Sequence, residues 1–327
     1  MTAKPGNLSF SQRAGVFIKS SPARMTLILA AFLFILTIII NPASLNQNTF
    51  ASIFILTVLL SIACAGQTIV LIGGGLDFTV GAVMSSTAIL TTYIMNGQDG
   101  RFLQVFVLAM GIGLLVGVIN GFICAKVSLP PMILTMAISN VVTRMEYVLT
   151  QGHPNGFAAP AFIATIFYKI GGVVPAIIIY AAIIWPLVFY ILNRSTFGKQ
   201  LFLVGANPHA AELNGINNNR IKILSYVISG VLCAFAGMLG GAYIQSARCQ
   251  LFDNYAFQSL IAVIVGGTAF TGGTGSFAGS IAGSLLMVVL SNGLTVLALP
   301  QTISNITLGC VMVLLLIVYN RAKAVRL

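Results

Sequence analysis

Side chains that could carry catalysis or proton transfer are few and scattered in this chain. Its 327 residues include only five acids. These acids are Asp77, Asp99, Glu146, Glu212 and Asp253. The sequence has no HExxH motif, no histidine cluster and no recognisable pair of nucleophile and base. It therefore disfavours an enzyme, and so few ionisable groups make an ion-coupled carrier hard to build.

Nucleotide and metal sites are not indicated either. Gly198-Lys199 is followed by Gln200, and Asn193 stands where a phosphate-binding loop needs its first glycine. The five cysteines have no paired spacing, so we expect them to pack as small hydrophobic residues. His153 and His209 are far apart and fall on opposite sides of the membrane in the topology derived below. We expect no metal and no cofactor in this chain.

The polar residues with the most suggestive spacing lie in two glycine clusters between apolar segments, IGGGLDFTVG at 72–81 and VGGTAFTGGTG at 265–275. A helix interrupted at membrane depth is tolerated only where protein or a cavity covers it, and interrupted helices in transporters commonly border the translocation path. A tight cytoplasmic turn between adjacent spans is the alternative. Under the first interpretation, the candidate path or gating residues are Asp77, Thr79, Gly81, Gln258, Gly266, Gly267 and Thr268.

Asp77 is the acid that falls within one of these clusters. An ionised carboxylate at the membrane centre costs about 2.5 to 3.5 kcal/mol on insertion scales, so the depth of Asp77 decides its role. At the cytoplasmic edge it would cap a helix that begins near Phe78, whereas deeper in the membrane it would take part in the path or its gating. Arg144 and Glu146 point about 200° from one another on a helix. Each either faces a polar partner on another span or lies near the outer end of its own.

Other glycines repeat every four residues within apolar segments. One set has serines beside it at 276, 280 and 284, and the other lies in an earlier segment. The two sets are Gly275, Gly279 and Gly283, and Gly113, Gly117 and Gly121. Because small residues let helix backbones approach closely in lipid, we expect these glycines to pack helices together.

The elements that position these residues are membrane spans. Of all residues 58% are hydrophobic and 6% are charged, far fewer charges than in a soluble domain. The apolar runs are 25–40, 50–72, 80–96, 102–125, 131–150, 173–192, 221–245, 255–271, 275–298 and 301–319. The sequence predicts an all-α polytopic membrane protein with about ten transmembrane helices and with interrupted helices or half-spans near Gly73–Gly75 and Gly266–Gly275. We expect a leader (1–24), one transmembrane domain (25–320) with a loop at 193–220, and a basic tail (321–327).

Positive charge orients this topology. Twelve of the basic residues fall on the side of the termini, and Arg101, Lys169 and Arg248 fall opposite. Since Lys and Arg collect in the cytoplasm, we expect both termini and the 198–219 loop to be cytoplasmic. The net charge of +11 then suits anionic lipid headgroups rather than nucleic acid.

A short capped helix is predicted within the 198–219 loop. Asn207 suits the N-cap, Pro208 the first helical position and Gly215 the C-terminal exit. Such a short helix cannot bury a face of its own in water. Between two membrane spans, it is best explained as a docking element for a soluble partner.

Three blocks carry a resemblance to a known family: GGLDFTVGAVM (74–84), VGANPHAAELNGIN (204–217) and VGGTAFTGGTGSFAGSIAGSLL (265–286), with NGL at 292–294. Together they resemble the sugar-type permease family of bacterial ATP-binding cassette importers. That family includes permeases for ribose, galactose, arabinose, xylose and autoinducer-2 and, more distantly, for branched-chain amino acids. The blocks occur in the same order with matching topology, which makes the match specific for the family but not for the solute.

The resemblance implies a multi-pass subunit of the bacterial inner membrane that imports a monosaccharide or similar small polyhydroxylated solute by alternating access. It implies three kinds of partner: ATPase subunits that bind ATP and Mg, a second permease subunit, identical or divergent, and a periplasmic substrate-binding protein. The implied ATPase-coupling residues, which would plug into a groove on the ATPase, are Asn207, Pro208, Ala210, Ala211, Glu212 and Gly215.

One departure from the family pattern leads to a further hypothesis. Where the family usually has a Glu-Leu-Asp run leading into Ile-Ala-Ala, this chain reads AFQSLIA at 256–262. Because both acids are missing, the chain is a candidate for the divergent half of a heteromeric permease pair. Two other functions stay open: a branched-chain amino acid permease of the same class, and a self-sufficient secondary carrier or channel outside it.

Overall fold

The computed structural model describes residues 22–127, 129–246 and 248–297, together with 303–304, 306–307, 309–310 and 313–314. Most of the leader, most of the expected tenth span (301–319) and the whole basic tail (321–327) lie outside the described residues. The regular secondary structure of the described part is helical, apart from one hairpin of two short strands. The prediction of an all-α membrane fold therefore holds for this part of the chain.

The elements follow one another along the chain with short connections. The α-helices are α2 (Pro22–Ile40), α3 (Gln47–Ile72), α4 (Val80–Met95), α5 (Phe102–Lys126), α6 (Pro131–Thr150), α7 (Pro160–Phe167), α8 (Ile178–Asn193), α9 (Thr196–Ala206), α10 (Pro208–Leu213), α11 (Asn218–Ile244), α12 (Tyr255–Val265) and α13 (Phe277–Val296). Two 3₁₀ turns, η1 (Pro42–Ser44) and η2 (Asp99–Arg101), and the antiparallel pair β1 (Lys169–Ile170) and β2 (Val174–Pro175) complete the described elements.

Six described helices are long and apolar enough to cross a membrane, and the count is seven if the bent pair α8 and α9 is one span. The expected runs 80–96 and 255–271 form helices of only 16 and 11 residues. A helix needs about 20 residues to span the hydrocarbon, so α4 and α12 are too short to cross alone. α4 begins only after the non-helical residues that follow α3, and α12 ends at Val265, before the Gly266–Gly267 pair. The prediction of ten crossings is therefore not established by the described helices.

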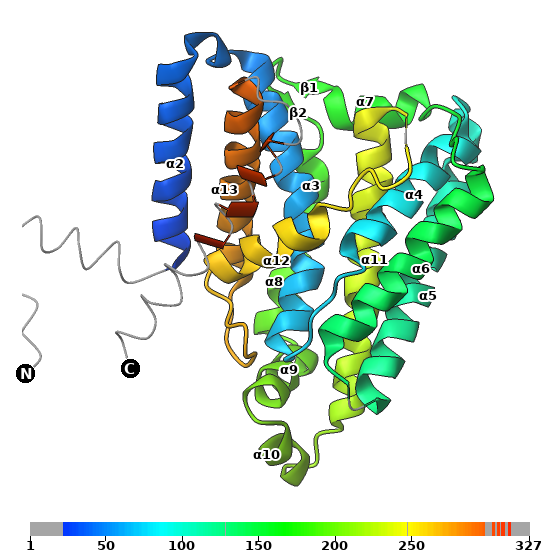
Figure 1. Cartoon of the computed structure of the whole chain (residues 1–327), viewed down its shortest axis with the longest axis vertical. Coiled ribbons are helices and arrows are strands. Elements are labelled where there is room, and N and C mark those ends of the chain that lie inside the picture. The colour runs from blue at the N-terminus through cyan, green and yellow to red at the C-terminus, as the bar shows by residue number, and fades with distance from the viewer. Residues whose placement is uncertain are drawn as a thin grey trace, which may run out of the picture.

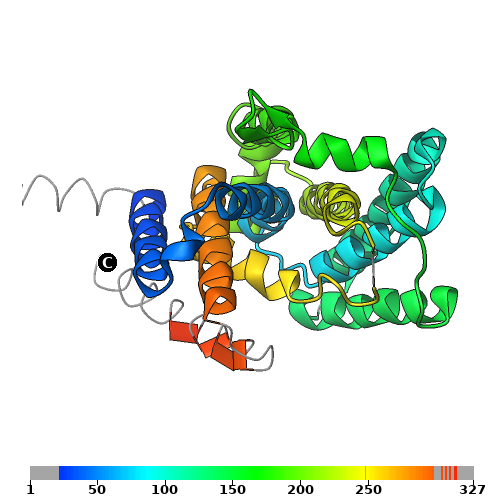
Figure 2. The same ribbon diagram turned by 90° about the horizontal axis from the view of Figure 1, so that it is seen from above.

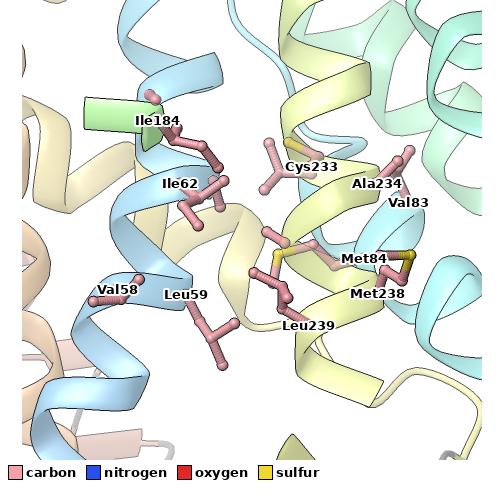
Figure 3. Packing of buried hydrophobic residues seen from close by; sticks show 14 of the residues in the cluster. Val58, Leu59, Ile62, Val83, Met84, Ile184, Cys233, Ala234, Met238 and Leu239 are labelled. Atoms are coloured by element: carbon pink, nitrogen blue, oxygen red, sulfur yellow. The ribbon is translucent and has the colours of Figure 1, made fainter. Parts of the chain in front are cut away.

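α3 and α11 form the centre of the helix bundle. Figure 2 shows them in the middle, with α2 and α13 on one side and α5 and α6 on the other. In the most apolar 18-residue stretch of α3, 94% of the residues are buried inside the molecule, whereas only 17% are buried in the corresponding stretches of α2 and α6. In Figure 3 apolar side chains of α3, α4 and α11 pack against one another, including Leu59, Met84 and Leu239. The outer helices therefore offer their surface to lipid or to partners.

The two ends of the bundle differ (Figure 1). One end carries α9 and α10, and we call it the α10 end; the other carries the β1–β2 hairpin, and we call it the hairpin end. Lys126, Arg194 and Lys199 lie at the α10 end, whereas Arg101 and Lys169 lie at the hairpin end. This division agrees with the orientation expected from the sequence.

Glycines allow several helices to approach backbone to backbone. A Cβ at Gly117 would come within 2.6 Å of the Tyr226 carbonyl oxygen, and one at Gly121 within 2.8 Å of the Ile223 Cα, both on α11. Gly113 lies equally close to the backbone of Gly230. On α13, Gly279 and Gly283 face the carbonyl oxygens of Gly266 and Ala262 at the end of α12. Gly275 precedes α13, and a Cβ there would meet Thr268 and Ile72.

Candidate functional site

The interrupted segment between α3 and α4 begins at the α10 end of the bundle and runs into its interior, where residues 77–79 are buried. α3 ends at Ile72 and α4 begins only at Val80, as the glycine cluster predicted. Gly74 has a φ of +77°, which favours glycine and turns the chain out of α3. From there residues 75–79 form a non-helical connection to α4 (Figure 1). The backbone groups of this segment must therefore find partners on neighbouring helices.

Asp77 is the polar centre of this segment, and only 2% of it is exposed. One carboxylate oxygen, Oδ1, accepts hydrogen bonds from the Thr79 amide at 2.9 Å and from the Thr79 hydroxyl. The other, Oδ2, accepts from the Ser229 hydroxyl of α11 at 2.8 Å. The Thr79 hydroxyl in turn accepts from the Asn120 side chain of α5 at 2.8 Å. Asp77 thus connects the interrupted segment to two helices.

Two further hydroxyl groups satisfy the backbone of the same segment. Tyr226 of α11 donates to the Leu76 carbonyl at 3.1 Å and accepts from the Leu76 amide at 3.2 Å. Thr135 of α6 accepts from the Phe78 amide at 3.2 Å. Asp77 does not cap a helix that begins near Phe78, because α4 begins at Val80 with Thr79 as its N-cap. The segment is therefore held by hydroxyls and an amide from α5, α6 and α11.

A second non-helical segment, residues 248–254 before α12, crosses the start of α4. A Cβ at Gly81 would lie 2.6 Å from the Phe252 carbonyl oxygen and 2.8 Å from that of Asp253. The Phe252 amide donates to the Ser85 hydroxyl of α4 at 2.8 Å. Phe78 and Phe257 make an edge-to-face ring contact with centroids 5.3 Å apart. The two short helices α4 and α12 therefore begin beside one another within the bundle.

Glu146 of α6 anchors this second segment. It is only 4% exposed, and it accepts hydrogen bonds from the Ser86 hydroxyl at 2.8 Å and the Gln250 amide at 3.1 Å. The Tyr147 hydroxyl donates to the Gln250 side chain at 2.9 Å. Arg144 is exposed on α6 and lies over the Tyr147 ring, 5.8 Å from its centroid. Of the two alternatives left by the sequence, Glu146 therefore faces polar partners on other elements.

The structure does not bring all of the predicted path residues together. Asp77, Thr79 and Gly81 lie along one segment, but Gly266 packs against Gly279 and Ser280 of α13. Gly267 turns the chain with a φ of +106°, and Thr268 is fully buried without a hydrogen-bond partner for its hydroxyl in the described structure. The residues that cross α4 come instead from 248–254, before α12. Gln258 lies one turn into α12 and is half-buried.

The predicted docking helix is α10. The Asn207 side chain caps it by accepting from the Ala210 amide at 3.0 Å, Pro208 is its first residue, and Gly215 follows it with a φ of +76°. Ala211 is buried, but Leu213 is 76% exposed. Ala210 and Glu212 are exposed too. The helix thus projects from the bundle with an apolar side chain at its tip.

Several residues of the site were not anticipated from the sequence. They are Ser85, Ser86, Asn120, Thr135, Tyr226, Ser229, Gln250, Phe252 and Asp253. Hydroxyl and amide side chains within apolar runs are the only local signal for most of them. Their roles depend on contacts between residues that are 41 to 167 positions apart.

Replacing Gly81 by alanine is expected to displace the 248–254 segment from α4. The added methyl group would overlap the Phe252 carbonyl, and such overpacking costs about 1–3 kcal/mol. Cys249 is half-buried beside Thr150 and reports on this segment in a Cys310→Ser background. We expect an impermeant maleimide to label Cys249 at least about fivefold faster when Gly81 is replaced by alanine. A factor of about five corresponds to about 1 kcal/mol, the lower end of the free-energy range above. Gly100→Ala, where a Cβ meets nothing within 4 Å, is the matched control. Equal labelling of both variants would contradict the crossing.

Comparison with known proteins places this arrangement among membrane transport components. Residues 49–316 match the family model described as branched-chain amino acid transport system, permease component. A fructose import permease of Rhizobium meliloti is 30% identical over 93% of this chain and 86% of its own length. A ribose import permease of Bacillus subtilis is 29% identical over 89% and 91%, respectively. A galactose/methyl galactoside import permease of Haemophilus influenzae is 30% identical over 86% and 90%. No solved structure matches.

Proposed function

The chain belongs to the family of permease components of branched-chain amino acid type transport systems, and on that premise we propose that it is the membrane subunit of an ATP-driven importer. It is a multi-pass membrane protein, and we place it in the bacterial inner membrane. The observation that carries the proposal is α10, an exposed and doubly capped helix between the bent pair α8 and α9 and the spanning helix α11. A transport subunit with such a helix takes its energy from a partner rather than from an ion gradient.

The proposed solute is a monosaccharide or a similar small polyhydroxylated molecule. The relatives described above import fructose, ribose and galactose by name. In keeping with such cargo, the groups that hold the interrupted segments are mostly neutral hydroxyls and amides, among them Thr79, Asn120 and Ser229. One observation favours a second candidate, a branched-chain amino acid: exposed Arg144 offers a cation to a carboxylate. Competition of labelled ribose uptake by fructose, galactose or leucine separates the two.

The proposed partners follow from the surfaces of the molecule. ATPase subunits, which hold ATP and Mg, dock on α10 through Leu213 and its neighbours, and a periplasmic binding protein delivers the solute at the hairpin end. A second permease subunit packs on α6, whose outward face carries exposed Asn140 near the middle of the helix and Arg144 four residues later. Polar side chains there are costly in lipid, which supports a protein or water-filled neighbour. The remaining apolar faces contact lipid, and no nucleic acid is involved.

The pairing of the permease subunits is decided by the composition of the purified complex. The chain lacks the two acids before the Gly266–Gly267 pair that related permeases usually have, which supports pairing with a divergent second permease. A complex that contains this chain as its only permease species, in two copies, would reject the heteromeric pair. That result would leave the importer function intact.

Gly215→Pro is expected to abolish both co-purification of the ATPase and ATP-driven uptake. Proline cannot adopt a φ of +76° and lacks the amide that donates to the Glu212 carbonyl at 2.9 Å, so the end of α10 loses about 3 kcal/mol. Gly172→Pro is a matched control, because Gly172 also has a φ of +76° and donates to the Lys169 carbonyl, but at the hairpin end. Uptake by the wild-type chain that follows an ion gradient without ATP would instead establish a secondary carrier.

A further inference from the structure

Three segments that are far apart in the sequence meet at the α10 end of the bundle. They are the end of α3 with its following turn, the last residues of α9, and the turn that precedes α13. Their contact is made by four glycines, Gly74, Gly205, Gly272 and Gly273, which we call the glycine junction. The two outer segments belong to the glycine clusters that interrupt the helices, and the middle one leads directly into α10.

Backbone lies against backbone throughout the glycine junction. A Cβ at Gly205 would overlap the Ile72 carbonyl oxygen and would come within 2.7 Å of the Gly273 nitrogen. A Cβ at Gly272 would lie 2.9 Å from the Gly74 Cα and 3.1 Å from the Gly205 oxygen. The Gly273 amide donates to the Ile72 carbonyl at 2.8 Å, which ties the two interrupted segments to each other across α9. No side chain fits between these segments.

The connection from the glycine junction to α10 is short and fixed by hydrogen bonds. Asn207 is at once the residue that ends α9 and the N-cap of α10. Its amide donates to the Leu203 carbonyl at 3.0 Å, and its side chain accepts from the Ala210 amide at 3.0 Å. Leu201 and Val204 of α9 are fully buried. Gly205 is therefore separated from α10 by two residues, and any shift of α10 moves α9 at the junction.

The connection from the glycine junction into the bundle is equally short. Gly74 is three residues from Asp77, whose carboxylate links the first interrupted segment to α11. On the other side, the turn is closed by hydrogen bonds from the Ala269 amide to Thr274 and from the Gly272 amide to Ala269. α13 begins four residues after Gly273. The first interrupted segment thus begins at the glycine junction, and the second passes through it shortly before α13.

We propose that the glycine junction transmits displacement of α10 to both interrupted segments at once, with Gly205 as the positioning residue. This proposal rests on the proposed function, since it needs an ATPase that moves α10. Packed backbones slide as units rather than deform continuously, so a small shift at Gly205 repositions the ends of both segments together. Both interrupted segments then respond to the same displacement, although residues 72–81 and 265–275 are far apart in the sequence.

Hydrogen exchange of the purified transporter, with its ATPase, tests the proposal in nucleotide-free and ATP-bound states. We expect exchange in residues 73–79 and 269–274 to change together by about 5- to 150-fold, the usual range for coupled sites. In Gly205→Ala, whose methyl group would overlap the Ile72 carbonyl, the change is expected to vanish while the ATPase still co-purifies and hydrolyses ATP. Gly111→Ala, on the exposed face of α5, has nothing within 4 Å and should behave as wild type.

The outcomes separate the two proposals. If nucleotide alters exchange at α9 and α10 but neither interrupted segment responds in the wild type, the junction does not transmit and the inference is wrong. The same conclusion follows if Gly205→Ala keeps the full response. If no ATPase binds the wild-type chain at all, the proposed function itself fails. The wild-type measurement decides the matter even where Gly205→Ala does not assemble.

Discussion

Gly279→Leu is expected to abolish assembly of the folded permease while leaving membrane insertion intact. A Cβ at Gly279 would overlap the carbonyl oxygen of Gly266, so not even a methyl group fits between α12 and α13. Overpacking in a well-packed interior costs about 1–3 kcal/mol and occasionally more, and a leucine against backbone belongs to the upper end. Insertion depends on hydropathy, which leucine raises. We expect the variant in the membrane fraction but without a monodisperse peak on size-exclusion chromatography.

Gly111→Leu is the control for this prediction. Gly111 is a membrane-helix glycine that is exposed on α5, and a Cβ there has no atom within 4 Å. Two residues away, Gly113 faces the Gly230 carbonyl on α11, and leucine at that position should fail as it does at Gly279. If Gly279→Leu assembles and transports like Gly111→Leu, the packing role of the glycine repeat on α13 is wrong.

The helix interruption after Ile72 and the bounds of α10 could be predicted because their signals are local. Consecutive glycines end α3, and one of them adopts a left-handed conformation that other residues avoid. Asn207 begins α10 because its side chain can accept a hydrogen bond from a free amide of the first turn, and Pro208 suits the first position because it has no amide to satisfy. Gly215 ends the helix because glycine readily adopts a positive φ. Such signals act within a few residues, so reading the chain in order is enough to find them.

The crossing of residues 248–254 over α4 could not be predicted, because nothing local marks it. Gln245 and Gln250 adopt positive φ angles, and because neither is a glycine the sequence gives no local sign of these turns. The contacts of Gln250 with Glu146 and of Phe252 with Ser85 join residues that are 104 and 167 positions apart. The number of crossings could not be fixed either, because hydropathy identifies apolar runs at 80–96 and 255–271 but does not show whether the helices that they form, of 16 and 11 residues, cross the membrane.

The same long-range contacts lead to the last prediction, which asks whether Asp77 acts through its hydrogen bonds or through its charge. Asp77→Leu removes the acceptor of three hydrogen bonds, from the Thr79 amide, the Thr79 hydroxyl and the Ser229 hydroxyl. Each buried donor left without a partner costs about 1–3 kcal/mol, so the loss is about 3 kcal/mol or more. We expect uptake to fall more than about a hundredfold, since each 1.36 kcal/mol is a factor of ten.

Asp77→Asn keeps the shape and can keep all three contacts. Its oxygen accepts from Thr79 as before, its amide donates to the Ser229 oxygen, and the Ser229 proton turns toward Cys233, whose sulfur lies 3.9 Å away. We therefore expect the Asp77→Asn transporter to retain uptake within about tenfold of wild type, because one neutral hydrogen bond contributes about 1 kcal/mol. Thermal unfolding of each purified variant separates loss of fold from loss of transport. If Asp77→Asn is as inactive as Asp77→Leu yet as stable as wild type, the charge itself takes part in gating, because geometry alone was preserved.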